Sequence, residues 1–198
     1  MKIIIVGAGL AGLSTAIALR KYVQPLDPDL EIKIYDEADT HGVHSMGWTD
    51  HADIRLKRQG AAISLQSNAL RVLRDLDPNL AEQVVATGFP CKGFTWKTAG
   101  GWLLGREWLG LLPVSRPRLI KCLVDALKRD KVVFHSVSKV VPVPGHRPVV
   151  HLDDGTIETA DLVVGADGIR SPIRRCLLGD HEEYRPRFTH VPLALRTV

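Results

Sequence analysis

The sequence has few cysteines and no clustered metal ligands. Its 198 residues include only three cysteines, Cys91, Cys122 and Cys176, an odd number spread widely along the chain. No Cys-x-x-Cys pair is present, so neither a disulfide framework nor a zinc site is expected. The eight histidines are dispersed without the spacing of ligands on a helix or a strand. We therefore expect no metal site.

A membrane-spanning run and a concentrated basic patch are also missing. Residues 3–19 carry no charge, but a spanning helix needs roughly 20 apolar residues, and glycines interrupt this run. Arg20 and Lys21 follow without a small-residue cleavage site, which argues against a signal peptide. The net charge of +4 is modest, and the basic residues are scattered without interleaved aromatics. We expect a cytoplasmic protein without stable membrane insertion or a nucleic-acid partner.

The first 36 residues contain the most informative pattern. Residues 2–6 read as a short, fully buried strand, and Gly7-Ala8-Gly9-Leu10-Ala11-Gly12 follows at once. Residues 13–19 have helical spacing, and a second strand over residues 31–35 ends on Asp36. A strand, a glycine turn, a helix and a second strand with a terminal acid form the unit that grips the ADP half of FAD or NAD(P).

Each residue type in this unit suits a particular task. Gly7 allows the tight turn, Gly9 lets the backbone approach a pyrophosphate, and Gly12 lets the helix pack against the strand. The helix N-terminus, where Leu10 and Ala11 lie, presents free N–H groups and a positive dipole end to the phosphates. Asp36 can accept hydrogen bonds from ribose hydroxyls. A glycine pattern alone would also suit a plain structural turn, but the flanking strands and the acid favour dinucleotide binding.

The rest of the chain predicts an α/β fold. A polar stretch over residues 37–59 is long for a loop, and helices are expected from residue 67 and over residues 117–128. The other expected elements are a hairpin near residues 89–108 and strands at 132–135, 148–152 and 162–164, with residues 153–156 turning between the last two. We predict a three-layer, Rossmann-like domain with a mainly parallel sheet of residues 2–6, 31–36, 132–135 and 162–166, plus an antiparallel flap.

A second signature lies near the C-terminal end. Residues 160–166 read as a buried strand that ends in Asp167-Gly168, and residues 169–174 open a helix. Together with the opening unit, this resembles the FAD-dependent aromatic hydroxylases, the single-component flavoprotein monooxygenases that include para-hydroxybenzoate and salicylate hydroxylases. Further segments resemble the family in the same order, namely residues 60–63, 68–70, 115–119 and 153–156.

The resemblance implies a cofactor, a co-substrate and further site residues. In relatives the Asp-Gly pair contacts the flavin, with Ser and Arg following, and Asp167, Gly168, Ser171 and Arg174 match that pattern. Arg116 matches an arginine that lies against the cofactor. FAD, NAD(P)H and a small aromatic substrate are therefore implied. From the residues alone, Asp167-Gly168 is equally compatible with a turn that caps the next helix, and Arg116 with a surface arginine.

The second strand is followed by a departure from the family. Glu37 stands where many relatives carry a basic residue, and we include it with Asp36 among the candidate cofactor-binding residues. The arginine that relatives bring near the adenosine has no clear counterpart, and Arg58 is the best candidate. We identify no catalytic acid or base.

The resemblance also suggests how the chain is divided. Residues 1–180 are expected to form the FAD-binding domain and residues 181–198 to start an incomplete substrate domain, with the 89–108 hairpin belonging to the substrate-side sheet. The family's third flavin signature would lie beyond residue 198. We interpret the chain as the N-terminal part of a NAD(P)H-dependent flavin monooxygenase. The alternatives are another FAD-dependent oxidase or dehydrogenase, or a non-catalytic truncated nucleotide-binding module.

We expect the 198-residue chain alone to be catalytically incomplete. With FAD, NADPH and phenolic acids it should give at most slow NADPH oxidation that ends in peroxide, because oxygen transfer needs a substrate held in a dry, shaped cavity. Hydroxylated product and peroxide, measured side by side, check this expectation. Coupled product formation by the isolated chain would contradict it.

Overall fold

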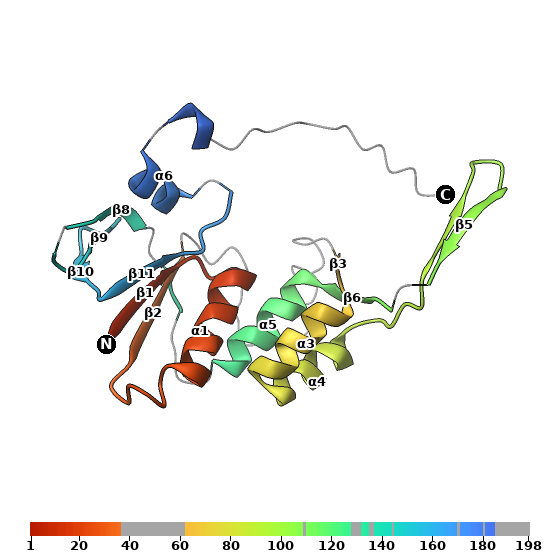
Figure 1. The fold of residues 1–198 in the computed structure, drawn as a ribbon, viewed down its shortest axis with the longest axis horizontal. Coiled ribbons are helices and arrows are strands. Elements are labelled where there is room, and N and C mark those ends of the chain that lie inside the picture. The colour runs from red at the N-terminus through yellow and green to blue at the C-terminus, as the bar shows by residue number, and fades with distance from the viewer. Residues whose placement is uncertain are drawn as a thin grey trace.

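The computed structural model describes residues 1–36, 62–108, 110–127, 132–134, 137–143, 145–169, 171–179 and 181–184 (Figure 1). At its centre is a four-stranded sheet in the order β11-β1-β2-β7, in which every neighbouring pair is parallel. Its strands are β1 (Lys2–Val6), β2 (Glu31–Asp36), β7 (Val132–Phe134) and β11 (Leu162–Gly165). The parallel sheet expected from the sequence is confirmed.

Helices cover one face of the parallel sheet. Ile3 and Ile5 of β1 are buried in the same core as Leu13 of the helix α1 (Leu10–Tyr22) and Leu119 of the helix α5 (Arg116–Ala126). Alternate side chains of a strand point to opposite faces, so these two isoleucines form one row. Figure 1 shows α1 and α5 side by side, with α3 (Ser67–Leu76) and α4 (Pro78–Thr87) beyond them.

Helix α4 was not expected from the sequence, although its start carries a clear signal. Asp77 is the N-cap, its carboxylate accepts a hydrogen bond from the Asn79 N–H at 2.8 Å, and Pro78 occupies the first helical turn. An acidic N-cap followed by proline is a typical start of a helix. The helix contributes Leu80 and Val84 to the core that also contains Ile3 and Ile5.

An antiparallel sheet covers the opposite face. Ile4 and Val6 share a second core with residues of β8 (Val137–Val141) and β9 (Val149–Leu152), and β10 (Ile157–Thr159) completes this sheet. Because β1 is covered on both faces, it is apolar from Ile3 to Val6 instead of alternating. The three layers are therefore helices, parallel sheet and antiparallel sheet.

The turn at residues 153–156 was assigned to the wrong pair of strands. It joins β9 to β10 in a hairpin and does not lead directly to β11. Gly155 has a φ of +85° and the Asp154 carboxylate accepts a bond from the Thr156 N–H at 2.8 Å. The three-residue β10 carries too short a pattern to be recognised in the sequence, and β8 was missed as well.

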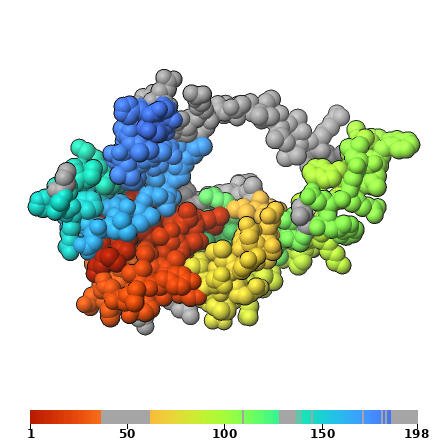
Figure 2. Space-filling model, viewed as in Figure 1, coloured from red at the N-terminus to blue at the C-terminus, as the bar shows by residue number. Residues whose placement is uncertain are grey.

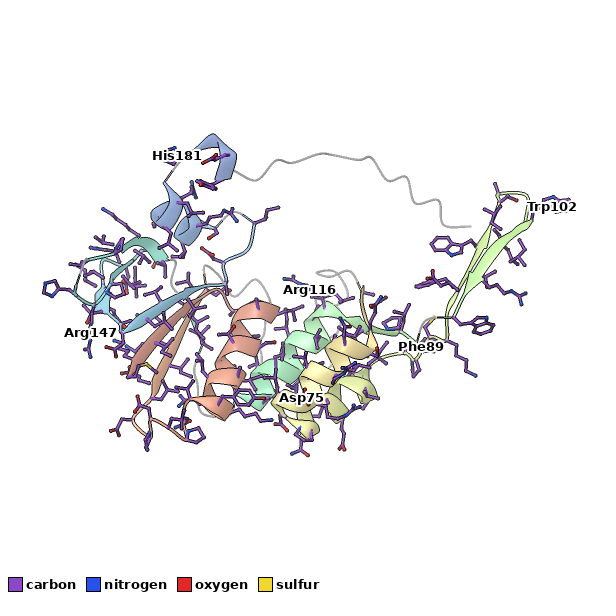
Figure 3. All side chains as sticks on the ribbon, in the orientation of Figure 1. Asp75, Phe89, Trp102, Arg116, Arg147 and His181 are labelled. Atoms are coloured by element: carbon purple, nitrogen blue, oxygen red, sulfur yellow. The ribbon has the colours of Figure 1, made fainter. Side chains whose placement is uncertain are left out.

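The expected hairpin is present and extends away from the layers. It consists of β4 (Phe94–Lys97) and β5 (Leu103–Glu107), which pair antiparallel. Figure 2 shows this hairpin in green, apart from the main body. Trp102, at its tip in Figure 3, is 79% exposed. No helix in the described segments combines the length and the apolar character that crossing a membrane would require.

One acidic side chain joins the parallel sheet to the antiparallel layer. The Glu158 carboxylate of β10 lies 2.7 Å from the Lys33 ammonium and 2.9 Å from that of Lys2, and it accepts a hydrogen bond from the Tyr35 hydroxyl at 2.9 Å. Burial raises the pKa of Glu158, but the bonds from Lys33, Lys2 and Tyr35 outweigh it and lower the pKa from 4.5 to about 2. Burial and the nearby Glu158 raise the pKa of Tyr35. Glu158 is therefore held ionised.

We expect Glu158→Gln to destabilise the fold in a pH-dependent way. A carboxylate with a lowered pKa contributes stability that is complete above its unfolded pKa and is lost as the pH falls through the folded pKa. The fall from 4.5 to about 2 corresponds to about 3 kcal/mol at neutral pH, lost as the pH drops from about 5 towards 2.

Urea unfolding at pH 7, 5 and 3 measures the effect. Glu158→Gln should lower the free energy of unfolding most at pH 7 and should make the acid dependence shallower. Glu82→Gln, on the exposed face of α4, is the matched control and should change little. Equal losses for both variants would contradict the interpretation.

Candidate dinucleotide-binding site

The predicted site residues gather where three parallel strands end. The Gly7 N–H, directly after β1, donates a hydrogen bond to the Tyr35 carbonyl of β2 at 2.6 Å. The Ala166 N–H, directly after β11, donates to the Val6 carbonyl at 2.7 Å. The glycine turn, Asp36 and the Asp167 turn therefore leave the sheet at one edge, where open α/β sheets bind ligands.

The two sequence signatures are in direct contact at this edge. Gly7 has a φ of +108°, and a Cβ built on it would lie 2.3 Å from the Ala166 carbonyl oxygen and 2.8 Å from the Asp167 nitrogen. A side chain here would be strained and would also collide with backbone. Ala166 was not recognised as a site residue, because nothing in the sequence shows which peptide packs on the glycine turn.

Gly12 and Gly9 have opposite surroundings. A Cβ on Gly12 would lie 1.9 Å from the Gly7 carbonyl oxygen, so the missing side chain lets α1 pack against the turn. A Cβ on Gly9 would meet no atom of the described residues within 4 Å. Gly12 is therefore required for packing, whereas the described part of the chain leaves the space in front of Gly9 open.

The start of α1 faces this space, and no described side chain caps it. Gly9 is the N-cap, and the first intrahelical bond runs from the Leu13 N–H to the Gly9 carbonyl at 3.0 Å. The N–H groups of Leu10, Ala11 and Gly12 precede that bond, so they belong to the unpaired first turn. Gly9 has no side chain to cap them, and the first turn contains no acid. Such an end attracts an anion.

Asp36 lies beside the turn, and one of its oxygens is engaged within the protein. The half-buried carboxylate accepts a hydrogen bond from the Ala8 N–H through Oδ2 at 2.5 Å. The contact expected for Asp36 from the sequence was with a ribose. The bond to Ala8 was not expected, because it depends on the alignment of β1 and β2. Glu37 and Arg58 lie outside the described residues.

Asp167 caps the following helix. Its Oδ2 accepts from the Ile173 N–H at 3.1 Å, and the buried Ser171 hydroxyl accepts from the Arg174 N–H at 2.8 Å, at the start of α6 (Pro172–Leu178). Gly168 between them has a φ of +79°. The capping alternative therefore holds for Oδ2, and the flavin contact expected for Asp167 and Gly168 stays a prediction.

Arg116 lies at the first position of α5. β6 (Leu112–Ser115) pairs antiparallel with β3 (Ala62–Leu65) and ends directly before it, so this small sheet sets where α5 begins. The side chain is half-buried. In Figure 3, Arg116 lies at the end of α5 on the same side of the molecule as the start of α1. Its contact with a cofactor also stays a prediction.

This geometry is that of a Rossmann-like domain, and comparison with known families agrees. Residues 5–76 match the model of the NAD(P)-binding Rossmann-like domain. The matched segment contains the glycine turn, α1 and Asp36.

The curated proteins of similar sequence include several monooxygenases. Over 96% of its length the chain is 29% identical to 3-amino-4-hydroxybenzoate 2-monooxygenase of Streptomyces cremeus, of which it covers 45%. It is 28% identical to 6-hydroxynicotinate 3-monooxygenase of Pseudomonas fluorescens over 90% of the chain and 43% of the relative. Zeaxanthin epoxidase of Spinacia oleracea is 29% identical and is covered to 27%. A further relative, the FAD-dependent monooxygenase ntnA of Nectria sp, is 28% identical and is covered to 22%. The chain is thus similar to monooxygenases and spans less than half the length of these relatives.

Solved structures support the fold. FqzB superposes with a TM-score of 0.70 at 22% identity, over 91% of this chain and 39% of that one. Klebsiella pneumoniae HpxO, complexed with FAD and uric acid, gives a TM-score of 0.66 at 24% identity, over 88% of this chain and 41% of that one.

We expect alanine at Gly12 and at Gly9 to affect the ligand-free fold very differently. Gly12→Ala forces a methyl group against the Gly7 carbonyl and should cost about 1–3 kcal/mol of stability, as overpacking does. Gly9→Ala enters open space and should change stability by less than about 1 kcal/mol. Urea unfolding without nucleotide measures both. Equal stabilities would contradict the assigned packing role of Gly12.

Proposed function

We propose that this chain binds FAD, with the ADP part at the edge where β1, β2 and β11 end. The observation that carries the proposal is the contact of the Gly7 turn with the Ala166–Asp167 peptide. It brings both signatures to one side of a helix N-terminus that has no acid in its first turn. The similarity to monooxygenases, one of which is named as FAD-dependent, supports the choice of cofactor.

The residues of the edge suit the chemistry of an ADP group. The N–H groups of Leu10 and Ala11 offer donors to the pyrophosphate, and Gly9 leaves room for its approach. Asp36 keeps its second oxygen for a ribose hydroxyl, since its Oδ2 is occupied by Ala8. The fit is therefore good for the nucleotide half of the cofactor.

The flavin half would lie towards the second signature and α5. Asp167 has a second carboxylate oxygen besides the one that caps α6. Among the described residues, no atom would lie within 4 Å of a Cβ on Gly168, so they leave the backbone accessible there. Arg116 would supply a fixed positive charge. When bound, FAD supplies the redox chemistry that connects NAD(P)H oxidation to oxygen activation.

For the whole protein we propose NAD(P)H-dependent monooxygenation of a small aromatic or similar substrate. The named relatives act on hydroxybenzoate and hydroxynicotinate compounds, and this chain covers 45% and 43% of them. We place the protein in the cytoplasm. We expect no nucleic-acid partner, because the net charge of the chain is only +4.

We also propose that residues 1–180 form the FAD-binding domain and that the β4–β5 hairpin belongs to the substrate side. Trp96, Trp102 and Trp108 are 56%, 79% and 75% exposed. Several large aromatic side chains that are exposed on or next to one hairpin are typical of a surface that another part of a protein covers. The position of the hairpin away from the parallel sheet supports a role outside the nucleotide site (Figure 1).

A second candidate ligand is a nicotinamide dinucleotide in place of FAD. The matched domain model is described as NAD(P)-binding, and both cofactors carry an ADP group. A non-catalytic nucleotide-binding module would show the same preference for ADP. Titration with FAD, NADH and NADPH distinguishes these ligands, and the proposal requires the tightest binding for FAD.

We expect Gly9→Leu to abolish FAD binding without loss of the fold. The leucine would fill the space in front of α1 that the pyrophosphate needs, yet its Cβ would meet no atom within 4 Å in the part of the chain that the structure describes. Quenching of flavin fluorescence gives the affinity, and thermal unfolding of the ligand-free variant checks the fold.

Gly110→Leu is the matched control. A Cβ on Gly110 also meets nothing within 4 Å, but this residue lies between the hairpin and β6. The control should bind FAD like the wild type. Equal FAD affinity in the Gly9 variant and the wild type would show that the ligand does not lie over this turn.

A further inference from the structure

The side chains of β2 point alternately to the two faces of the sheet, and this alternation directs Asp36 at the glycine turn. Ile32, Ile34 and Asp36 share one face of the strand, and both isoleucines are buried in the core on the side of α1. The carboxylate therefore emerges on the helix side of the sheet, where the chain passes from β1 into α1. There its Oδ2 accepts the Ala8 N–H at 2.5 Å.

The bond to Ala8 completes the attachment of the turn to the end of β2. The preceding N–H, that of Gly7, already donates to the Tyr35 carbonyl at 2.6 Å. Two successive N–H groups of the turn are thus held by two successive residues of β2, one through its backbone and one through its side chain. A hydrogen bond to an ionised carboxylate is roughly twice as strong as a neutral one.

We propose that Asp36 is a positioning residue that holds the glycine turn through Ala8, in addition to any contact with a ribose. The inference rests on the proposed nucleotide site for its consequence in binding. Ala8 directly precedes Gly9, the N-cap of α1. The carboxylate therefore sets where Gly9 and the first N–H groups of α1 present themselves to a pyrophosphate.

This dual role makes a prediction that a ribose contact alone does not. If Asp36 served only the ribose, its removal would matter only for ligands with ribose hydroxyls. If it also holds the turn, its removal weakens the grip on the phosphates of any nucleoside diphosphate. Asparagine keeps an acceptor oxygen for the Ala8 N–H, whereas alanine has none.

The test compares ADP with 2′,3′-dideoxy-ADP, which lacks both ribose hydroxyls, by calorimetry on the full chain. Asp36→Ala should weaken dideoxy-ADP by about three- to tenfold, as expected for the loss of one such hydrogen bond, and should weaken ADP further. Asp36→Asn should recover most of the dideoxy-ADP affinity. Glu31→Ala, at the exposed start of the same strand, should leave both affinities unchanged.

Unchanged dideoxy-ADP affinity in Asp36→Ala, together with weakened ADP, would overturn the inference and leave Asp36 with the ribose alone. Amide hydrogen exchange of the ligand-free protein gives an independent measurement. The Ala8 N–H should exchange faster in Asp36→Ala than in the wild type, and Asp36→Asn should restore its protection.

The two proposals fail in different ways. A wild-type chain that binds neither ADP nor FAD would refute the proposed function. The exchange rate of Ala8 would still decide whether Asp36 holds the turn, and equal rates in the wild type and Asp36→Ala would overturn that role.

Discussion

The contact between Gly7 and the Ala166–Asp167 peptide determines the geometry of the whole site. β1 and β11 are hydrogen-bonded neighbours, so the backbones that leave their carboxyl ends must pass each other closely. With a Cβ position only 2.3 Å from the Ala166 oxygen, only a residue without a side chain can occupy position 7. The same turn then meets Gly12 on its other side, where a Cβ would lie 1.9 Å from the Gly7 oxygen. The turn is thus held between the second signature and α1.

Carboxylates supply the remaining restraints at this edge. Asp36 holds the turn after β1, and Asp167 holds the start of α6 after β11, each through one backbone N–H. A carboxylate has two oxygens and can accept several bonds, so each acid can serve the protein with one oxygen and a ligand with the other. Asp36 and Asp167 therefore restrain the loops that follow β1 and β11, and the proposed function would give each of them a second role towards the cofactor.

The layer opposite the helices depends on a different kind of interaction. Glu158 joins β10 to Lys2 and Lys33 of the central strands, and Ile4 and Val6 share an apolar core with β8 and β9. Neither layer alone would bury β1 on both faces. The antiparallel sheet thus buries β1 on the side away from α1.

The sequence by itself determined the opening unit, the strands at 2–6, 31–36 and 162–166 and the helix after Gly9. These features depend on local patterns: an apolar run for a strand buried on both faces, glycines where the backbone needs them, and an acid at a strand end. The strand β10 was not predicted, because a three-residue strand has almost no pattern. The helix α4 was not predicted, because its Asp77-Pro78 start was not recognised. Only the tertiary structure decided that Gly7 packs on Ala166, that Asp36 accepts the Ala8 N–H and that one oxygen of Asp167 caps α6. Each of these contacts joins segments that strand pairing or the path of a loop brings together. The spacing of residues along the sequence does not determine which backbone groups then face each other.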